Sequence, residues 1–309
     1  MAYSIPTVDL STFFREGDED GKKKAMEVIS QSCFQCGFFQ ILNHGVSLKL
    51  MSQALELSKT FFDYSDEDKL KSSPGSGAPL PAGYNKQPAH SPDKSEYVLM
   101  FLPSTSFNVY PENPPEFKEV MGDMFSHLTK IGSLIESIID ECLEHEDRNC
   151  ITSVFQDQVG GLEVRHNGKW IPVTPAEDTT VVNLGDVIWV LSNNKFTSAT
   201  HRVVRPKGKS RYSYAFFYNL QGDKWVEPLS KFTEEIGEAP KYRGFLLKEY
   251  QALRMRNKTH PPDKPEDVIH ITHYAFTSQI SNYVTFDAPC EIQTRVFLLI
   301  MLYFILSNL

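Results

Sequence analysis

Hydrophobic and polar positions follow a helical period through most of the first half of the chain. Residues 21–36 place apolar side chains three or four positions apart, and Gly37 ends that pattern. The same period predicts helices over 47–63 and 64–71, and the second starts with acidic residues that suit a helix N-terminus. The longest pattern predicts one amphipathic helix over 115–143, with its apolar face formed by Phe117, Val120, Met121, Met124, Phe125, Leu128, Ile131, Leu134, Ile135 and Ile138.

After residue 143 the pattern changes to short β-rich runs at close intervals. The runs are ITSVFQ, GLEVRH, KWIPV, TTVVNL, VIWVLS, HRVVRP and RYSYAFFYNL. Asn167-Gly168 between two of them is a strong hairpin signal. Closely spaced strands with tight turns predict a sandwich or jelly-roll barrel. Shorter strands are expected in IPTVDLSTFF and FFQILNHGV near the N-terminus, and a closing helix is expected over 240–257.

These patterns predict an α+β protein in successive regions. We expect an N-terminal region over 1–114, the long helix over 115–143, a β core over 144–222, a helical region over 223–275 and an atypical apolar tail over 276–309. Within the first region, Gly, Pro and Ser dominate residues 72–95, which predicts a long loop, and loops of that length in a compact domain are usually functional lids or disordered.

The apolar run from Val296 to Leu306 in the tail is too short for a transmembrane helix, which needs about 20 residues. A core helix, a membrane-surface anchor and an appended tail stay open as interpretations, and the appended tail is favoured.

Composition narrows the class of partner and the compartment. The chain has 309 residues and a net charge of −8, so it lacks the basic stripe that collects nucleic-acid or membrane phosphates. The N-terminus has no apolar segment typical of a secretory signal. Cys33 and Cys36 form a C-x-x-C at the end of a helical pattern, which favours buried thiols over a redox motif. We therefore expect a cytoplasmic protein without a nucleic-acid partner or a stable membrane span, and we expect it to be a monomer.

The stretch ECLEHEDRNC at 141–150 contains the first candidate chemistry. His145 and Asp147 can bind one metal ion only if the chain is extended there, and an acidic helix end is the commoner explanation for such a cluster. His201, in SATHRVV, is the candidate third ligand because it starts a β-rich run. Two histidines and one carboxylate with open positions suit a non-haem Fe(II) oxygenase.

Arg211 and Ser213, in RYSYAFF, provide the second candidate site. As residues i and i+2 of a strand they face the same side, where a guanidinium and a hydroxyl can bind a carboxylate. A surface ion pair of Arg211 is the simpler alternative. The set of His-x-Asp, a distant His and Arg-x-Ser ten residues later is more specific than any of its parts.

This ordered set resembles the plant-type 2-oxoglutarate- and Fe(II)-dependent dioxygenases, the family that contains flavonol synthase, anthocyanidin synthase and the gibberellin oxidases. The resemblance covers most of residues 4–275 and includes IPTVDLS, CGFFQILNHGV, GGLEVRHNGKWIPVTP, VVNLGDVIWVLSNNKFTSATHRVV and RYSYAFF. It implies a double-stranded β-helix (jelly-roll) core with a helical N-terminal region and a C-terminal helix. It also implies that His145, Asp147 and His201 bind Fe(II), and that Arg211 and Ser213 hold the distal carboxylate of 2-oxoglutarate.

The activity implied by the resemblance couples conversion of 2-oxoglutarate and O2 to succinate and CO2 with hydroxylation, desaturation or demethylation of a small organic substrate. Ascorbate is the expected reductant, and the substrate class is a specialised metabolite or hormone. A non-catalytic truncated relative that binds metal or a partner is the alternative. A zinc hydrolase is disfavoured because it would leave Arg211 and Ser213 without a role.

The chain departs from the family pattern before the His-x-Asp motif. Glu144 alone separates Leu143 from His145, where the family has a loop and the first barrel strands. Other departures are Arg148 in place of a Gly, Asp178 where a Gly is common, and Trp189 in place of a Gln. We therefore expect an incomplete barrel, weakened iron and co-substrate binding, and impaired turnover.

Further residues are assigned from their positions. Tyr84, Glu96 and Tyr97, in and after the Pro- and Gly-rich loop, are candidate substrate contacts, as is Phe216 on the strand of Arg211. Phe217 is a candidate with Phe216, and for both residues a core position is the commoner outcome for an aromatic side chain. His44, in the turn NHG, is expected to be structural.

Overall fold

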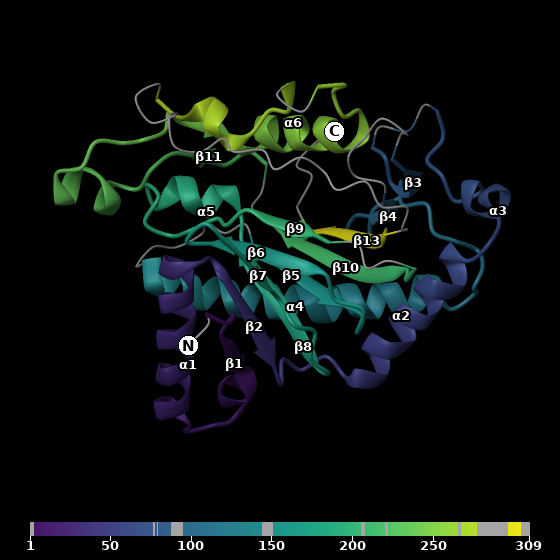
Figure 1. Ribbon diagram of the computed structural model, residues 1–309, viewed down its shortest axis with the longest axis horizontal. Coiled ribbons are helices and arrows are strands. Elements are labelled where there is room, and N and C mark those ends of the chain that lie inside the picture. The colour runs from purple at the N-terminus through teal and green to yellow at the C-terminus, as the bar shows by residue number, and fades with distance from the viewer. Residues whose placement is uncertain are drawn as a thin grey trace.

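The computed structural model describes residues 3–76, 78, 80–87, 95–143, 151–204, 208–219, 222–264, 267–276 and 296–303. Helices are concentrated in the first half of the chain and strands in the second (Figure 1). The helices are α1 (Glu19–Gln35), α2 (Leu48–Phe62), α3 (Asp66–Leu70), α4 (Phe117–Leu143), α5 (Asp186–Leu191) and α6 (Leu247–Thr259), with short 3-10 helices at Leu10–Phe14, Ser230–Phe232, Glu234–Ile236 and Ile271–Tyr274.

The strands form one large sheet and two small ones. They are β1 (Thr7–Asp9), β2 (Phe38–Leu42), β3 (Gly83–Lys86), β4 (Glu96–Met100), β5 (Ile151–Gln156), β6 (Leu162–His166), β7 (Lys169–Pro172), β8 (Thr179–Leu184), β9 (His201–Val203), β10 (Arg211–Tyr218), β11 (Trp225–Val226), β12 (Phe245–Leu246) and β13 (Val296–Tyr303). The large sheet has the order β1-β2-β8-β5-β10-β13-β4-β3, the next has the order β7-β6-β9, and β11 pairs with β12.

From β5 to β10 the chain crosses repeatedly between the two larger sheets, as in a jelly roll. Strands β5, β8 and β10 belong to the large sheet, whereas β6, β7 and β9 form the three-stranded sheet. In the described part of the chain, β9 pairs with β6 alone, so this sheet ends there and the barrel is not closed. The predicted α+β class with an incomplete jelly-roll core is confirmed.

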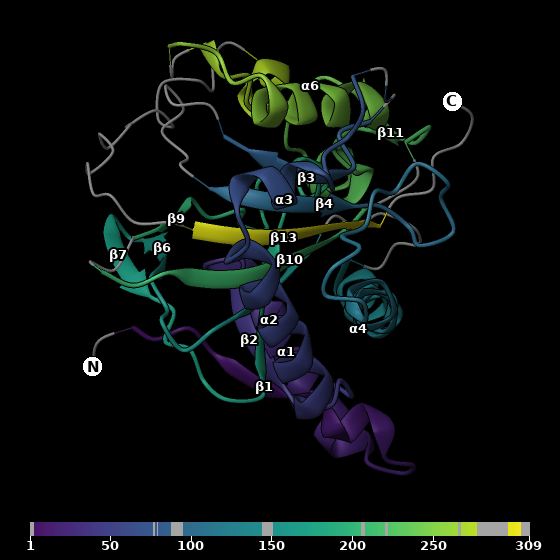
Figure 2. The ribbon, with the colours of Figure 1, turned by 90° about the vertical axis from the view of Figure 1, so that its right-hand side faces the viewer.

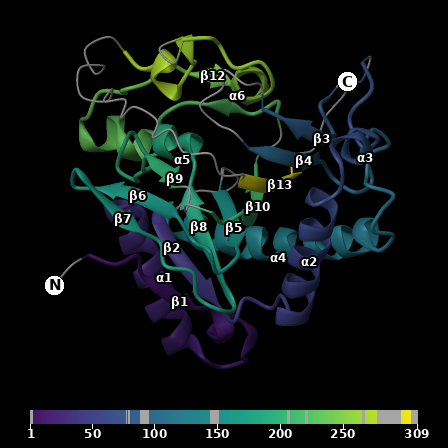
Figure 3. The ribbon, with the colours of Figure 1, turned by 45° about the vertical axis from the view of Figure 1, so that its right-hand side comes forward.

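Helix α4 covers one face of the large sheet, and α6 lies on the opposite side of the molecule (Figures 1 and 3). Most of the apolar stripe predicted along α4 is buried in the main core, where the rings of Phe125 and Phe216 of β10 meet edge to face with their centroids 5.3 Å apart. Burial of each such side chain contributes about 1.5–3 kcal/mol. Gly132 allows close packing, because a Cβ there would lie 2.5 Å from the ring of Tyr218.

Three local features agree with the sequence. Asn167 and Gly168 both have positive φ, 49° and 76°, as the predicted two-residue hairpin turn requires. Asp178 has φ of 60°, a left-handed conformation that explains why a glycine suits that turn. Cys33 and Cys36 are buried, and the Cys36 thiol donates to the Phe38 carbonyl at 3.2 Å.

His44 has the structural role expected of it. Its Nδ1 accepts from the Val46 amide at 3.3 Å, so Nε2 carries the proton and donates to Thr180 Oγ1 at 3.2 Å. The residue is 2% exposed, and this burial lowers the pKa of His44.

Other expectations were wrong or incomplete. The run VIWVLS is helix α5 rather than a strand, because Gly185 and Asp186 start a helix and short apolar runs fit either structure. The closing helix begins at Leu247, later than expected, because the preceding residues form β12. The residues predicted as the 72–95 loop include β3, which pairs with β4.

The apolar tail contains a strand. Residues Val296–Tyr303 form β13 in the interior of the large sheet, so this part of the tail is neither a core helix nor a free appendage. None of the helices in the described part of the chain is both long and apolar enough to cross a membrane. The five-region division along the chain stays a prediction.

Candidate co-substrate and metal site

Strand β10 presents two different faces. Tyr214 and Phe216 point toward the α4 side, where they join the main core. Arg211 and Ser213 occupy the opposite face by the two-residue period of a strand. On neighbouring β5, Val154 shares that second face and packs against apolar residues of the three-stranded sheet. Arg211 and Ser213 therefore lie on the inner face, between the sheets.

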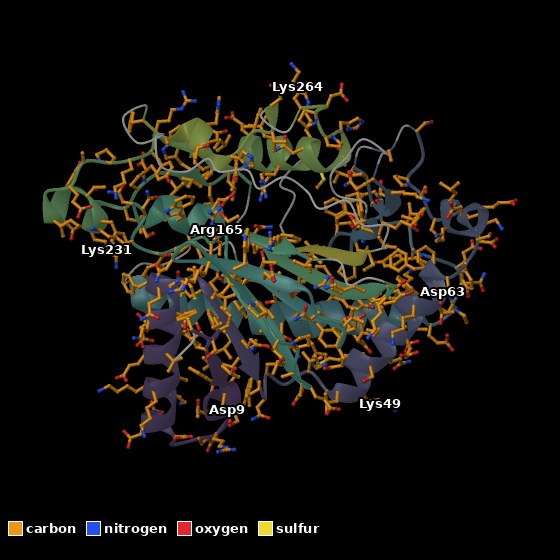
Figure 4. All side chains as sticks on the ribbon, viewed as in Figure 1. Asp9, Lys49, Asp63, Arg165, Lys231 and Lys264 are labelled. Carbon is orange, nitrogen blue, oxygen red and sulfur yellow. The ribbon has the colours of Figure 1, made fainter. Side chains whose placement is uncertain are left out.

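Arg211 is held by three neutral acceptors. Its Nε donates to the Gly160 carbonyl at 2.9 Å, Nη1 donates to Ser213 Oγ at 2.7 Å, and Nη2 donates to Gln156 Oε1 at 2.9 Å. Arg211 is 2% exposed, in contrast to Lys49 and Lys264, which project from the periphery (Figure 4). The three bonds fix the plane of the guanidinium on the inner face.

The guanidinium of Arg211 is a buried cation that forms no ion pair within the described residues. Burial lowers the pKa of Arg211 to about 10, and the charge of Asp157 acts in the opposite direction. The Asp157 carboxylate itself accepts from the amides of Tyr212 at 2.8 Å and Val159 at 3.0 Å. A buried cation without a carboxylate in direct contact is costly, so this site favours an anionic ligand.

Gln156 adds an unsatisfied hydrogen-bond donor beside Arg211. It lies directly opposite Ser213 in the β5–β10 register and is 7% exposed. Its Oε1 accepts from Arg211, whereas its Nε2 has no hydrogen-bond partner in the described structure. A carboxylate, which only accepts hydrogen bonds when ionised, fits this set of donors. Sequence reasoning missed Gln156, whose only signal is its place at the end of an apolar strand.

His201 starts β9, and one of its two ring nitrogens is held by the backbone. Its Nδ1 donates to the Ala199 carbonyl at 3.1 Å, so Nε2 keeps its lone pair for a ligand bond. The ring packs edge-on against Phe38 at 5.3 Å. Desolvation by the surrounding protein lowers the pKa of His201, although the residue as a whole is exposed to solvent. A neutral imidazole is the form that binds a metal.

The other two predicted metal ligands, His145 and Asp147, lie outside the described residues. Within the described residues no group of three His, Cys, Asp or Glu side chains could hold a metal ion. The triad of His145, Asp147 and His201 therefore stays a prediction.

Two of the predicted substrate contacts, Tyr84 and Glu96, belong to a buried ion-pair network. Glu96 Oε2 accepts from Lys69 Nζ at 2.7 Å and from the Tyr84 hydroxyl at 2.9 Å. Lys69 is fully buried and also lies 3.1 Å from Asp66. Sequence reasoning did not find Lys69. These contacts join α3, β3 and β4, and a role for Tyr84 or Glu96 in substrate binding stays a prediction.

Phe216 and Tyr97 differ in their relation to the site. Phe216 lies on the α4 side of β10, so its position argues against contact with a ligand at Arg211. Phe217 shares the face of Arg211 instead and packs beside the cluster of Ala82, Tyr97, Leu99 and Phe101. Tyr97 is thus part of the apolar wall next to Phe217.

A separate cavity of about 360 Å³ lies at α3 and β3. It is lined by Asp66, Leu70, Ser73, Pro74, Tyr84, Asn85 and Lys86. Arg211 and Ser213 do not contribute to its lining.

The structure is a jelly-roll protein with a buried arginine and an unsatisfied amide donor on the inner face of its large sheet. Residues 107–220 match the 2OG-Fe(II) oxygenase superfamily, and residues 5–121 match the N-terminal region described as non-haem dioxygenase in morphine synthesis. Jasmonate-induced oxygenase 1 of Arabidopsis thaliana is 34% identical over 275 residues, which cover 74% of this chain and 67% of that protein.

Solved structures show the same fold. JOX2 in complex with 2OG, Fe and JA has a TM-score of 0.65 and 23% identity, over 89% of this chain and 90% of that one. The rice dioxygenase for auxin oxidation has a TM-score of 0.67 and 20% identity, over 88% and 100% of the two chains.

The chain belongs to the 2OG-Fe(II) oxygenase superfamily, which confirms the resemblance seen in the sequence. It is an Fe(II)- and 2-oxoglutarate-dependent oxygenase that uses O2, and ascorbate is the reductant typical of the family.

Proposed function

We propose that this oxygenase binds Fe(II) through His145, Asp147 and His201, and binds the distal carboxylate of 2-oxoglutarate through Arg211 and Ser213. The observation that carries the proposal is the buried Arg211 guanidinium, which has three neutral acceptors and no carboxylate partner in the described structure. A non-catalytic, truncated relative is not favoured, because it gives no reason for a buried and preorganised cation.

The bound iron would supply activation of O2, with loss of CO2 from 2-oxoglutarate. The protein's own residues position the co-substrate. Arg211 Nη1 and Nη2 each use one of their two hydrogens on protein acceptors, which leaves one N–H on each nitrogen for a carboxylate. Gln156 Nε2 would donate a further hydrogen bond. The Ser213 hydroxyl accepts from Arg211 and can direct its own hydrogen to the same carboxylate.

The organic substrate we propose is a small molecule with an apolar body, oxidised by hydroxylation, desaturation or demethylation. Phe217 and the cluster that contains Tyr97 form an apolar wall on the face of β10 that carries the anion receptor. Apolar walls with a few polar groups are typical of small-molecule sites. One similar solved structure contains JA and another is a dioxygenase for auxin oxidation, which supports a hormone or specialised metabolite as the substrate.

Turnover is expected to be impaired, because β9, which carries His201, is an unsupported edge in the described structure. An edge strand with one neighbour holds a metal ligand less rigidly than a central strand does.

We also propose that the protein acts as a cytoplasmic monomer without a nucleic-acid partner. Buried thiols at Cys33 and Cys36 suit a reducing compartment, and the net charge of −8 disfavours polyanions. Light scattering during size-exclusion chromatography tests the monomer, and a mass twice that of the chain would contradict it.

The test of the function is succinate formation from labelled 2-oxoglutarate with ferrous iron and ascorbate. We expect slow iron-dependent turnover that is lost in His201→Ala and Arg211→Leu. The matched controls are His260→Ala and Arg243→Leu, which change exposed residues of the same types. Absence of both succinate and calorimetric 2-oxoglutarate binding in the unmodified protein would refute the proposal. Turnover as fast as that of an intact relative would refute the expected impairment.

A further inference from the structure

The C-terminal strand β13 occupies a central position between two strands that are distant in sequence. It pairs in parallel with β10 along its whole length, from Arg211 opposite Val296 to Tyr218 opposite Tyr303. On its other side it pairs in parallel with β4, from Phe297 opposite Glu96 to Met301 opposite Met100. Figure 2 shows β13 between β10 and β4.

The sequence of β13 suits that position independently of the pairing. Val296–Tyr303 reads VFLLIMLY, an unbroken apolar run without a charge. Strands buried on both faces within parallel pairs have this pattern, whereas strands with one wet face alternate apolar and polar residues. The run that looked anomalous as a tail is therefore the pattern expected of an interior parallel strand.

Without β13 the large sheet would be divided. Neighbouring strands lie about 4.8 Å apart, so β10 and β4 on either side of β13 are about 10 Å apart, too far for direct hydrogen bonds. Strand β4 would keep β3 as its neighbour, and a two-stranded unit is marginally stable by itself. The position between β10 and β4 is called the slot below. The connection between α4 and β5, residues 144–150, is too short to supply both a strand for this slot and the His-x-Asp motif.

The slot also borders the co-substrate site. At the end of β10 that carries Arg211 and Ser213, β13 is the neighbour on one side and β5 on the other, with Leu298 opposite Ser213. Backbone pairing on both sides fixes the position of a strand, and with it the direction of its side chains.

We propose that the slot between β10 and β4 is a strand-acceptor site whose occupant is this chain's own residues 296–303. The C-terminal segment thereby completes a sheet that the short α4–β5 connection leaves incomplete. Its second consequence, that β13 positions Arg211 and Ser213 for 2-oxoglutarate, rests on the proposed function.

Hydrogen exchange of the unmodified full-length protein, followed by mass spectrometry, tests the strand without any ligand. We expect amides of residues 296–303 in the monomer to exchange at least about 100-fold more slowly than an unstructured peptide. Exchange at the unstructured rate would overturn the proposal. Protection found only in a dimer fraction would also overturn it, because the occupant would then be the strand of a second copy.

A pair of proline variants tests the link to the site. Leu299→Pro removes a ladder hydrogen bond in the middle of β13, whereas Ser307→Pro changes the chain beyond the end of the strand. We expect Leu299→Pro to speed exchange in β4 and β10 and to weaken 2-oxoglutarate binding about 10-fold or more, with Ser307→Pro unchanged. Faster exchange in β4 and β10 with unchanged affinity would overturn the positioning role.

If Leu299→Pro fails to fold, the exchange pattern of the unmodified protein still decides the strand assignment. If the unmodified protein neither binds 2-oxoglutarate nor forms succinate, the proposed function is refuted but the strand assignment is unaffected.

Discussion

Replacing Gln156 with glutamate should disable the co-substrate site without unfolding the protein. Gln156 Oε1 lies 2.9 Å from Arg211 Nη2, and both side chains are buried. Gln156→Glu keeps the shape of the side chain but gives Arg211 an internal counter-charge. At about 4 Å and an effective dielectric constant near 20, two unit charges attract by about 4 kcal/mol. The introduced carboxylate would then compete with the 2-oxoglutarate carboxylate for Arg211.

The expected loss of affinity follows from the bond that the ligand loses. A hydrogen bond to a charged group contributes about 1.5–3 kcal/mol, so 2-oxoglutarate should bind roughly 10- to 100-fold more weakly. The variant also replaces the Gln156 Nε2 donor with an acceptor, which acts in the same direction. Thermal stability without ligand should stay equal or rise, because a buried cation gains a partner.

Calorimetric titration of 2-oxoglutarate into protein loaded with Mn(II), a metal that permits binding without turnover, measures the affinity. Gln158→Glu is the matched control, because it makes the same substitution at an exposed position two residues away. The reasoning fails if a folded Gln156→Glu protein binds 2-oxoglutarate as tightly as the parent does. It also fails if Gln158→Glu weakens binding equally, since the effect would then be one of net charge.

Three further predictions concern stability. Burial lowers the pKa of His44, whereas the unfolded chain binds that proton near pH 6.5, so stability should fall as pH drops below 6.5. In chemical denaturation, the gap in unfolding free energy between the parent and His44→Gln should narrow by up to about 1.4 kcal/mol between pH 7.5 and 5.5, and a constant gap would contradict this. Gly132→Ala should lower the melting temperature, because the added Cβ would lie 2.5 Å from the buried ring of Tyr218. Gly122→Ala, on the same helix but in open space, should raise the free energy of unfolding by up to about 1 kcal/mol. Equal shifts for the two glycines would be inconsistent with that packing. Lys69→Met should lower the free energy of unfolding in urea by about 3 kcal/mol, because it removes the buried cation nearest to the Glu96 carboxylate and leaves only the half-exposed Lys86 beside it. Exposed Lys71→Met should change little, and equal losses would refute the difference.

Elements whose pattern is local were predictable from the sequence. Helix α4 was found within two residues of its start and at its end, because its apolar stripe repeats over many turns. The Asn167-Gly168 hairpin was found because two residues with positive φ carry their own signal. Helix α5 was missed because six apolar-rich residues fit a strand as well as a helix, and the choice depends on packing against distant residues.

Elements defined by distant partners were not predictable in the same way. The apolar run of β13 was visible, but its place depends on a slot formed by β4 and β10, which are themselves far apart in sequence. The buried Lys69–Glu96 pair likewise joins two short elements across a loop, and neither residue has a local pattern that reveals the other.

The site was predictable to the extent that its residues lie close together on one strand. Arg211 and Ser213 share a face by the period of two, which the sequence states directly, and the structure places them in hydrogen-bond contact at 2.7 Å. Gln156 was missed because its role depends on cross-strand register, which brings it opposite Ser213 from 57 residues earlier in the chain. The same period argues against Phe216 and favours Phe217 as a wall of the site.

The two halves of the proposed site differ in how firmly the fold holds them. Arg211 and Ser213 lie on a central strand with β5 and β13 as neighbours, and the guanidinium has three fixed contacts. His201 lies on a three-residue strand that pairs with β6 alone in the described structure, and His201 itself is exposed to solvent. Side chains on a buried strand that has a neighbour on each side, such as Arg211 and Ser213, should keep their geometry when a barrel lacks strands. A side chain on an edge strand, such as His201, should lose its geometry more easily, because it has fewer neighbouring strands. We therefore expect the short connection before β5 to weaken metal retention before it weakens recognition of the co-substrate, which predicts slow turnover together with measurable 2-oxoglutarate binding.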